Sequence, residues 1–201
     1  MCGARGGRKM TSGWKVVGTP VPEPPVPQPV AMEFSLHEAG WASLTVRCGE
    51  RHYKIENFGY CTDGLGDVVR AALSIATGAT HAEVLFDGEP NLWGLAIAPA
   101  GLSPESVRIA WLTIREDGGS LDGEGYANIP VWKWTSPILL EGFVTTDAFA
   151  RAVLAMAKKA REDFDDATYR ARWGFYGSLE GFPLRATRAL ETALSIREYR
   201  E

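Results

Sequence analysis

Cysteine is scarce in this sequence of 201 residues, and the three that occur lack the spacing of a metal site or a disulfide framework. Cys2, Cys48 and Cys61 are an odd number, no two form a CxxC motif, and no histidine stands at ligand spacing from them. This pattern argues against both stabilising disulfides and zinc. We therefore expect no bound metal and a reducing, cytoplasmic location.

Long hydrophobic runs are also missing. No stretch approaches the roughly 18 uninterrupted apolar residues that a membrane-spanning helix needs. The basic residues near the N-terminus are followed by glycine, serine and proline, whereas a secretory signal would continue with an apolar segment. The sequence thus predicts a protein that neither crosses a membrane nor is exported.

The usual catalytic signatures are absent as well. His37, His52 and His81 occur singly, with no HxxxH, HExxH or GxSxG motif nearby. The glycines between Gly59 and Gly66 precede a helical pattern but lack the P-loop lysine and the GxGxxG spacing. We therefore expect no cofactor, and we favour a protein that is not an enzyme.

Charge is distributed unevenly along the chain. The first 31 residues hold four basic residues and one acid, and the whole chain has a formal net charge of −4, so residues 32–201 carry −7. An acidic body disfavours binding to nucleic acid, because a nucleic-acid surface needs a basic stripe that releases counterions from the phosphates. The same charge favours a basic protein partner.

Proline marks a boundary near the N-terminus. Residues 19–29 contain six prolines in eleven positions, which favours a solvated, extended segment over packed structure. We predict a disordered Gly/Pro-rich leader over 1–31 and a single domain over 32–201. The leader is interpreted as a spacer, an upstream extension or, alternatively, a ligand for an SH3-like or WW-like module.

The first part of the domain shows one clear hairpin and one clear helix. Residues 44–48 and 53–56 alternate apolar and polar side chains around a Gly49-Glu50 turn. A helix is then predicted between a cap at Thr62 or Asp63 and a stop at Gly78. Its apolar stripe consists of Leu65, Val68, Val69, Ala72, Leu73 and Ala76.

Further strands and two C-terminal helices complete the pattern. Strands are predicted at 82–86 and 92–97, at 107–115, which is apolar on both faces, and once or twice within 129–144. Helices are predicted to begin near Thr146 and at Pro183. The fold class is therefore α+β, with a largely antiparallel sheet of about five to seven strands, one amphipathic helix after the first hairpin and two C-terminal helices.

Acidic residues gather in two segments that packing could bring together. Helix capping and turn chemistry explain them in structural terms, because Asp satisfies helix N–H groups and Asp-Gly-Glu-Pro suits a turn. The functional interpretation is an acidic recognition patch with aromatic anchors. Its candidate binding residues are Tyr60, Asp63, Asp67, Asp87, Glu89 and Trp93.

The sequence 63–78, followed by 86–90 and Trp93, resembles a group of small uncharacterised bacterial proteins that is similar to the immunity proteins of polymorphic toxin systems. The segment 173–190 resembles their C-terminal part. The resemblance implies a protein that occludes a toxin and carries no catalytic residue. A basic toxin or effector is thus the expected partner.

Two function hypotheses remain open at this point. The first is an immunity-type protein that binds and occludes a basic partner without chemistry of its own. The second is an enzyme or small-ligand-binding protein with a pocket between the sheet and the helices, using acids such as Asp63, Asp67 or Glu89. The sequence does not predict an oligomeric state.

Overall fold

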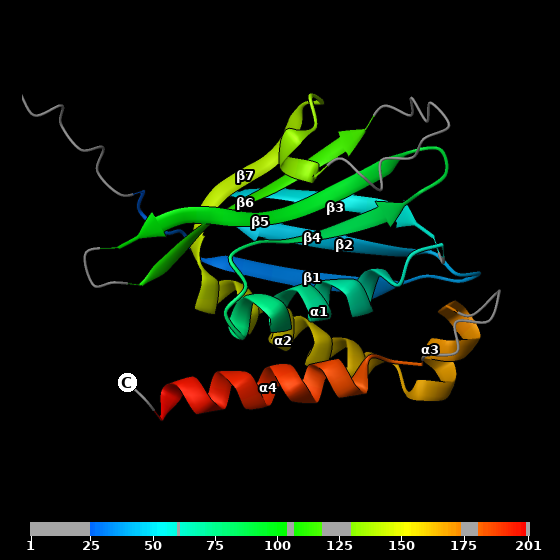
Figure 1. The fold of residues 1–201 in the computed structure, drawn as a ribbon. Coiled ribbons are helices and arrows are strands. Elements are labelled where there is room, and N and C mark those ends of the chain that lie inside the picture. Colours follow the sequence, from blue (N-terminus) through cyan, green and yellow to red (C-terminus); the bar gives the residue numbers. More distant parts are fainter. Residues whose placement is uncertain (1–24, 60, 104–106, 118–129, 174–180, 200–201) are drawn as a thin grey trace, which may run out of the picture.

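The computed structural model describes residues 25–59, 61–103, 107–117, 130–173 and 181–199. In these ranges the chain forms seven strands, four helices and a 3₁₀ turn, arranged as an α+β fold (Figure 1). No helix in the described ranges has the length and apolar character needed to cross a membrane.

The first sheet has three antiparallel strands in the order β1-β2-β3. β2 (Ala42–Cys48) and β3 (Arg51–Phe58) form the predicted hairpin, closed by a turn in which Gly49 has a φ of 60°. β1 (Val30–Leu36) pairs with β2 and was not assigned from the sequence. The chain just before β1 is also tied down, because Gln28 N donates to Phe143 O at 2.7 Å.

The second sheet has four antiparallel strands in the order β4-β5-β6-β7. They are β4 (Ala82–Asp87), β5 (Leu92–Leu102), β6 (Arg108–Asp117) and β7 (Ile138–Thr145). β6 lies between β5 and β7, as its two apolar faces predict. Of the one or two strands expected within 129–144, the structure forms β7, and Val131–Lys133 forms the 3₁₀ turn η2.

The expectation of a single sheet is wrong, because the strands divide into two sheets. The helix that connects β3 to β4 packs on β4, and the strand ladders of β3 and β4 are not hydrogen-bonded to each other. The two sheets meet where Gly59 N donates to Asp87 O at 2.6 Å.

The described residues form four helices, one more than the three that were predicted. The helices pack on one side of the strands (Figure 1). They are α1 (Gly64–Ala76), α2 (Thr146–Asp163), α3 (Asp166–Trp173) and α4 (Leu184–Glu198). α1 packs on β4, α2 packs on β1, and α4 packs on both α1 and α2. The extra helix is α3, which has eight residues and buries only Tyr169 and Trp173, too little to give a periodic signal.

One hydrophobic core joins both sheets to the helices. The Phe58 ring lies 4.9 Å from the Phe86 ring and 6.1 Å from that of Trp173, so β3, β4 and α3 meet there. The core also includes Trp93, one of the candidate binding residues. A smaller cluster of Ala96, Val131 and Trp134 covers part of the other face of the second sheet. Trp111, on β6, is half-buried.

Candidate functional site

A hollow lies where the two sheets meet, at the β1–β2 turn, β3 and the β4–β5 turn. Its volume is about 850 Å³. We call it the aromatic–acidic cleft, and its lining is His37, Glu38, Trp41, Tyr53, Lys54, Glu56, Asn57, Gly88, Glu89, Pro90, Asn91 and Trp93. It opens between strand edges, so it is not the pocket between sheet and helices that the second hypothesis assumed.

Unusual backbone conformations concentrate around this cleft. In the described residues, three amino acids other than glycine have a positive φ, namely Ala39 at 57°, Asn57 at 53° and Glu89 at 35°. Asn57 and Glu89 line the cleft, and Ala39 lies in the turn between its lining residues Glu38 and Trp41. Such conformations cost free energy and gather where a binding site requires a particular backbone path.

Three aromatic side chains form the walls of the cleft. Trp93 packs over Gly88, and any Cβ at position 88 would overlap its ring, so glycine is required there. Trp41 lies beside Gly59, where an added Cβ would meet its ring at 3.4 Å. The Trp93 indole lies beside the Tyr53 side chain and lowers the pKa of that phenol, although burial raises it more strongly. The Trp93 Nε1–H itself reaches no acceptor in hydrogen-bonding geometry among the described residues.

Acidic groups outnumber basic groups in the lining. Glu38, Glu56 and Glu89 are exposed, and Lys54 is the single Lys or Arg among the lining residues. The Lys54 ammonium forms an ion pair with Glu56 at 2.9 Å, which holds the pKa of the Glu56 carboxyl below its usual value. The charges of Glu38 and Glu89 remain without a basic partner in the lining, so the cleft attracts cations.

Glu89 also belongs to a small group of possible metal ligands. The Cys61 thiol donates to Glu89 Oε1 at 3.4 Å, and one ligand atom each from Cys61, Asp87 and Glu89 lie within 4.8 Å of one another. Burial, followed by the nearby carboxylates, raises the pKa of the Cys61 thiol. These residues could hold a divalent cation such as Zn²⁺ only with the thiol deprotonated, which the raised pKa opposes.

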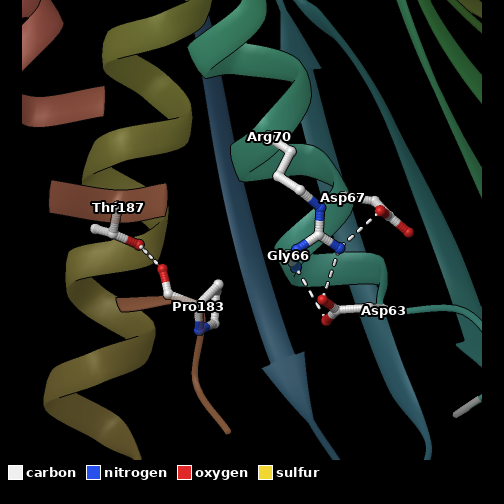
Figure 2. A network of polar contacts seen from close by, with 6 residues as sticks. All are labelled: Asp63, Gly66, Asp67, Arg70, Pro183 and Thr187. Atoms are coloured by element: carbon white, nitrogen blue, oxygen red, sulfur yellow. Dashed lines mark hydrogen bonds and ion pairs between the residues drawn. The ribbon is translucent and has the colours of Figure 1, made fainter. Parts of the chain in front are cut away.

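Asp63 and Asp67 form a separate network at the start of α1 (Figure 2). Asp63 caps the helix by accepting from Gly66 N at 3.3 Å. The Arg70 guanidinium lies 2.7 Å from Asp63 and 2.8 Å from Asp67 and forms an ion pair with each carboxylate. Burial raises the pKa of Asp63, and the hydrogen bond from Arg70 opposes that rise. Capping chemistry therefore accounts for these two acids.

The structure distributes the six predicted binding residues over three places. Glu89 and Trp93 line the cleft, while Asp87 supports its rim by accepting from Glu89 N at 3.1 Å. Asp63 and Asp67 do not line it, and Tyr60 lies outside the described residues.

Sequence reasoning missed the contributions of the first sheet to the cleft. Trp41, Tyr53 and Asn57 line it together with the predicted Glu89 and Trp93. The available signal was a tryptophan directly after glycine in the connection between two alternating segments. Nothing local, however, indicated that this connection meets the turn at 88–91.

Comparison with known proteins gives no assignment. No protein-family model matches the chain, and neither the curated proteins nor the solved structures contain a match to it.

Proposed function

We propose that the protein binds a basic segment of a partner protein in the aromatic–acidic cleft and acts by covering that segment, without chemistry of its own. The observation that carries the proposal is the combination of three aromatic walls with the carboxylates of Glu38 and Glu89. An arginine or lysine side chain is attracted both to the faces of aromatic rings and to carboxylates. The cleft therefore suits a cationic side chain.

The residue types that line the cleft are those that contribute strongly to binding at protein–protein interfaces. Tryptophan and tyrosine are enriched among the residues that contribute most of the binding free energy, and surrounding charges guide association. The net charge of the chain, −4, adds a long-range attraction for a basic partner. The resemblance of residues 63–78 to immunity-type proteins supports the same class of function, with a toxin or effector as the partner.

Site-specific photo-crosslinking tests this proposal. Asn91 is exposed and lines the cleft, whereas Glu50 is exposed in the β2–β3 turn and does not line it. A photoreactive amino acid at position 91, illuminated in the native host, is expected to capture one predominant protein with a basic surface. The same group at position 50 is the control. Equal capture at both positions, or capture of acidic proteins alone, would show that the cleft is not the interface.

A small cationic ligand is the second candidate, and the size of the cleft is the observation that favours it. Ligand pockets span roughly 300–1,000 Å³, and about 850 Å³ lies within that range. Thermal unfolding with a panel of organic cations and metabolites separates the two candidates. A ligand at 100 times its dissociation constant stabilises by about 2.7 kcal/mol, so a clear shift would favour this second function.

A further inference from the structure

A second hollow lies at the start of α4. Unlike the aromatic–acidic cleft, its lining is mainly basic. Its volume is about 700 Å³, and it is bounded by α1, α3 and the first turns of α4. We call it the arginine groove, after its lining residues Arg70, Arg170, Arg185 and Arg188. Among its described lining residues, Asp166 is the one acid. Four guanidinium groups around one hollow are unexpected in a chain whose net charge is −4.

Two of these arginines are held in place by acids. Arg70 is fixed by Asp63 and Asp67, as described above, and it lies across from Pro183 and Thr187 of α4 (Figure 2). The Nε atom of Arg170 lies 2.9 Å from Asp166, whose other oxygen accepts from Phe182 N at 3.2 Å. Asp166 therefore ties α3 to the start of α4 and sets the shape of the groove.

The other two arginines have no ion-pair partner among the described residues. Arg185 and Arg188 are exposed, one turn apart on α4, and neither guanidinium has an ion-pair or hydrogen-bond partner in the described part of the chain. Residues three apart on a helix present their side chains on the same face. They add two positive charges to the groove, and no ion pair within the described residues offsets them.

The backbone adds further donors. α4 has no side-chain cap, and the N–H groups of Arg185 and Ala186 reach no acceptor within the described residues. Pro183 and Leu184 give the groove an apolar edge beside these donors. Guanidinium groups match the geometry of phosphate oxygens and bind them through paired hydrogen bonds.

We infer that the arginine groove binds the phosphate group of a small organic phosphate. The anion would contact Arg185 and Arg188, and its organic part would lie along Leu184 and Pro183. A nucleic acid is a poorer fit, because the surrounding chain is acidic and would repel the neighbouring phosphates of a long polyanion. This inference does not depend on partner binding in the aromatic–acidic cleft, which is lined by other residues.

Calorimetric titration of the full chain tests the inference at constant ionic strength, with inorganic phosphate, pyrophosphate and phenyl phosphate as probes. The double variant Arg185→Gln/Arg188→Gln removes the two unpaired cations. Arg197→Gln removes one cation from the opposite end of α4 and serves as the control. Melting temperatures without ligand establish that all variants are folded.

We expect wild type and Arg197→Gln to bind pyrophosphate equally, and the double variant to bind at least about tenfold more weakly. Phenyl phosphate should bind more tightly than inorganic phosphate, because its ring adds apolar contact. The inference is overturned if wild type binds none of the probes, if the double variant keeps wild-type affinity, or if phenyl phosphate has no advantage. Tighter, steeply salt-dependent binding of a single-stranded oligonucleotide would also overturn it.

Discussion

The Tyr169 hydroxyl is buried in the core and has no hydrogen-bond partner in the described residues. Burial, with a smaller contribution from the Asp63 carboxylate, raises the pKa of this phenol strongly. A buried polar group without a partner costs about 1–3 kcal/mol relative to water. We therefore predict that Tyr169→Phe leaves the free energy of unfolding unchanged or raises it by up to that amount.

Urea denaturation at neutral pH checks the Tyr169→Phe prediction. The destabilising comparison is Trp173→Phe, which replaces the buried indole stacked on Tyr169 at a centroid distance of 6.2 Å with a smaller ring. A loss of more than about 1 kcal/mol in Tyr169→Phe would mean that the hydroxyl is hydrogen-bonded in solution.

Asp63 gives a prediction about pH. Its pKa is raised in the folded protein, mainly by burial, so the native state takes up its proton at a higher pH than the unfolded chain does. Protonation therefore stabilises the fold as the pH falls, and this contribution is lost as the pH rises through the folded pKa. Asn at this position keeps the helix cap but does not titrate.

As the pH falls toward 3.8, the ordinary pKa of Asp, the free energy of unfolding of wild type should therefore rise relative to that of Asp63→Asn. Urea titrations over a pH series measure it. If acidification instead stabilises Asp63→Asn relative to wild type, the ion pair with Arg70, rather than burial, dominates the pKa of the Asp63 carboxyl.

Among the elements, those with a local repeating pattern were predicted from the sequence. α1 has an apolar stripe, a cap at Asp63 and Gly78 directly after its C-cap, and the sequence alone indicates all three. In the structure Gly78 has a φ of 120°. The β2–β3 hairpin is equally local, because Gly49 sets its turn. These features depend on neighbours only a few residues away.

The elements that were missed depend on partners far along the chain. β1 alternates correctly, but its first residues were assigned to the proline-rich segment, and pairing with β2 decides its extent. α3 presents two core residues, too few for a periodic signal. The division into two sheets depends on which strands pair over long range, and no local pattern encodes that pairing.

At the scale of the α1 helix, we predict that Val69→Asp and Leu73→Ala both destabilise the protein. Val69 is fully buried, so an unpaired carboxylate there should prevent folding or cost several kcal/mol. Leu73 is half-buried against the core, so its truncation should fall near the lower end of about 2–5 kcal/mol. Ser74→Ala, exposed on the same helix, is the control. Thermal unfolding measures all three, and wild-type stability of Val69→Asp would mean that α1 does not face the sheets.

At the scale of the whole molecule, the proline-dense sequence before Pro25 predicts that the domain folds without it. The structure extends packed residues N-terminally to Gln28, so the deletion should remove residues 2–24 and keep 25–31. We expect the melting temperature to change by about 1–2 °C, because this composition lacks apolar periodicity. A loss of ten degrees or more, about the effect of a deleted core contact, would contradict the prediction.

The cleft is also a property of the whole molecule, since neither sheet forms it alone. Glu89 and Trp93 were proposed as binding residues from their own segment, but the turn that supplies Trp41 comes from the other sheet. Long-range packing of the two sheets determines the site, so the sequence indicated only one side of it.

The kinetics of partner binding test the central proposal most directly. Once crosslinking at position 91 has identified the partner, its association rate is measured over a range of salt for wild type, Glu38→Lys/Glu89→Lys and the control Glu50→Lys. All three positions are exposed, so each substitution should change stability by only about 0.5 kcal/mol. We predict that the double variant associates more slowly and with a weaker salt dependence, and that Glu50→Lys has the smaller effect. A folded double variant that binds the partner with the wild-type rate and salt dependence would contradict the proposed role of the aromatic–acidic cleft.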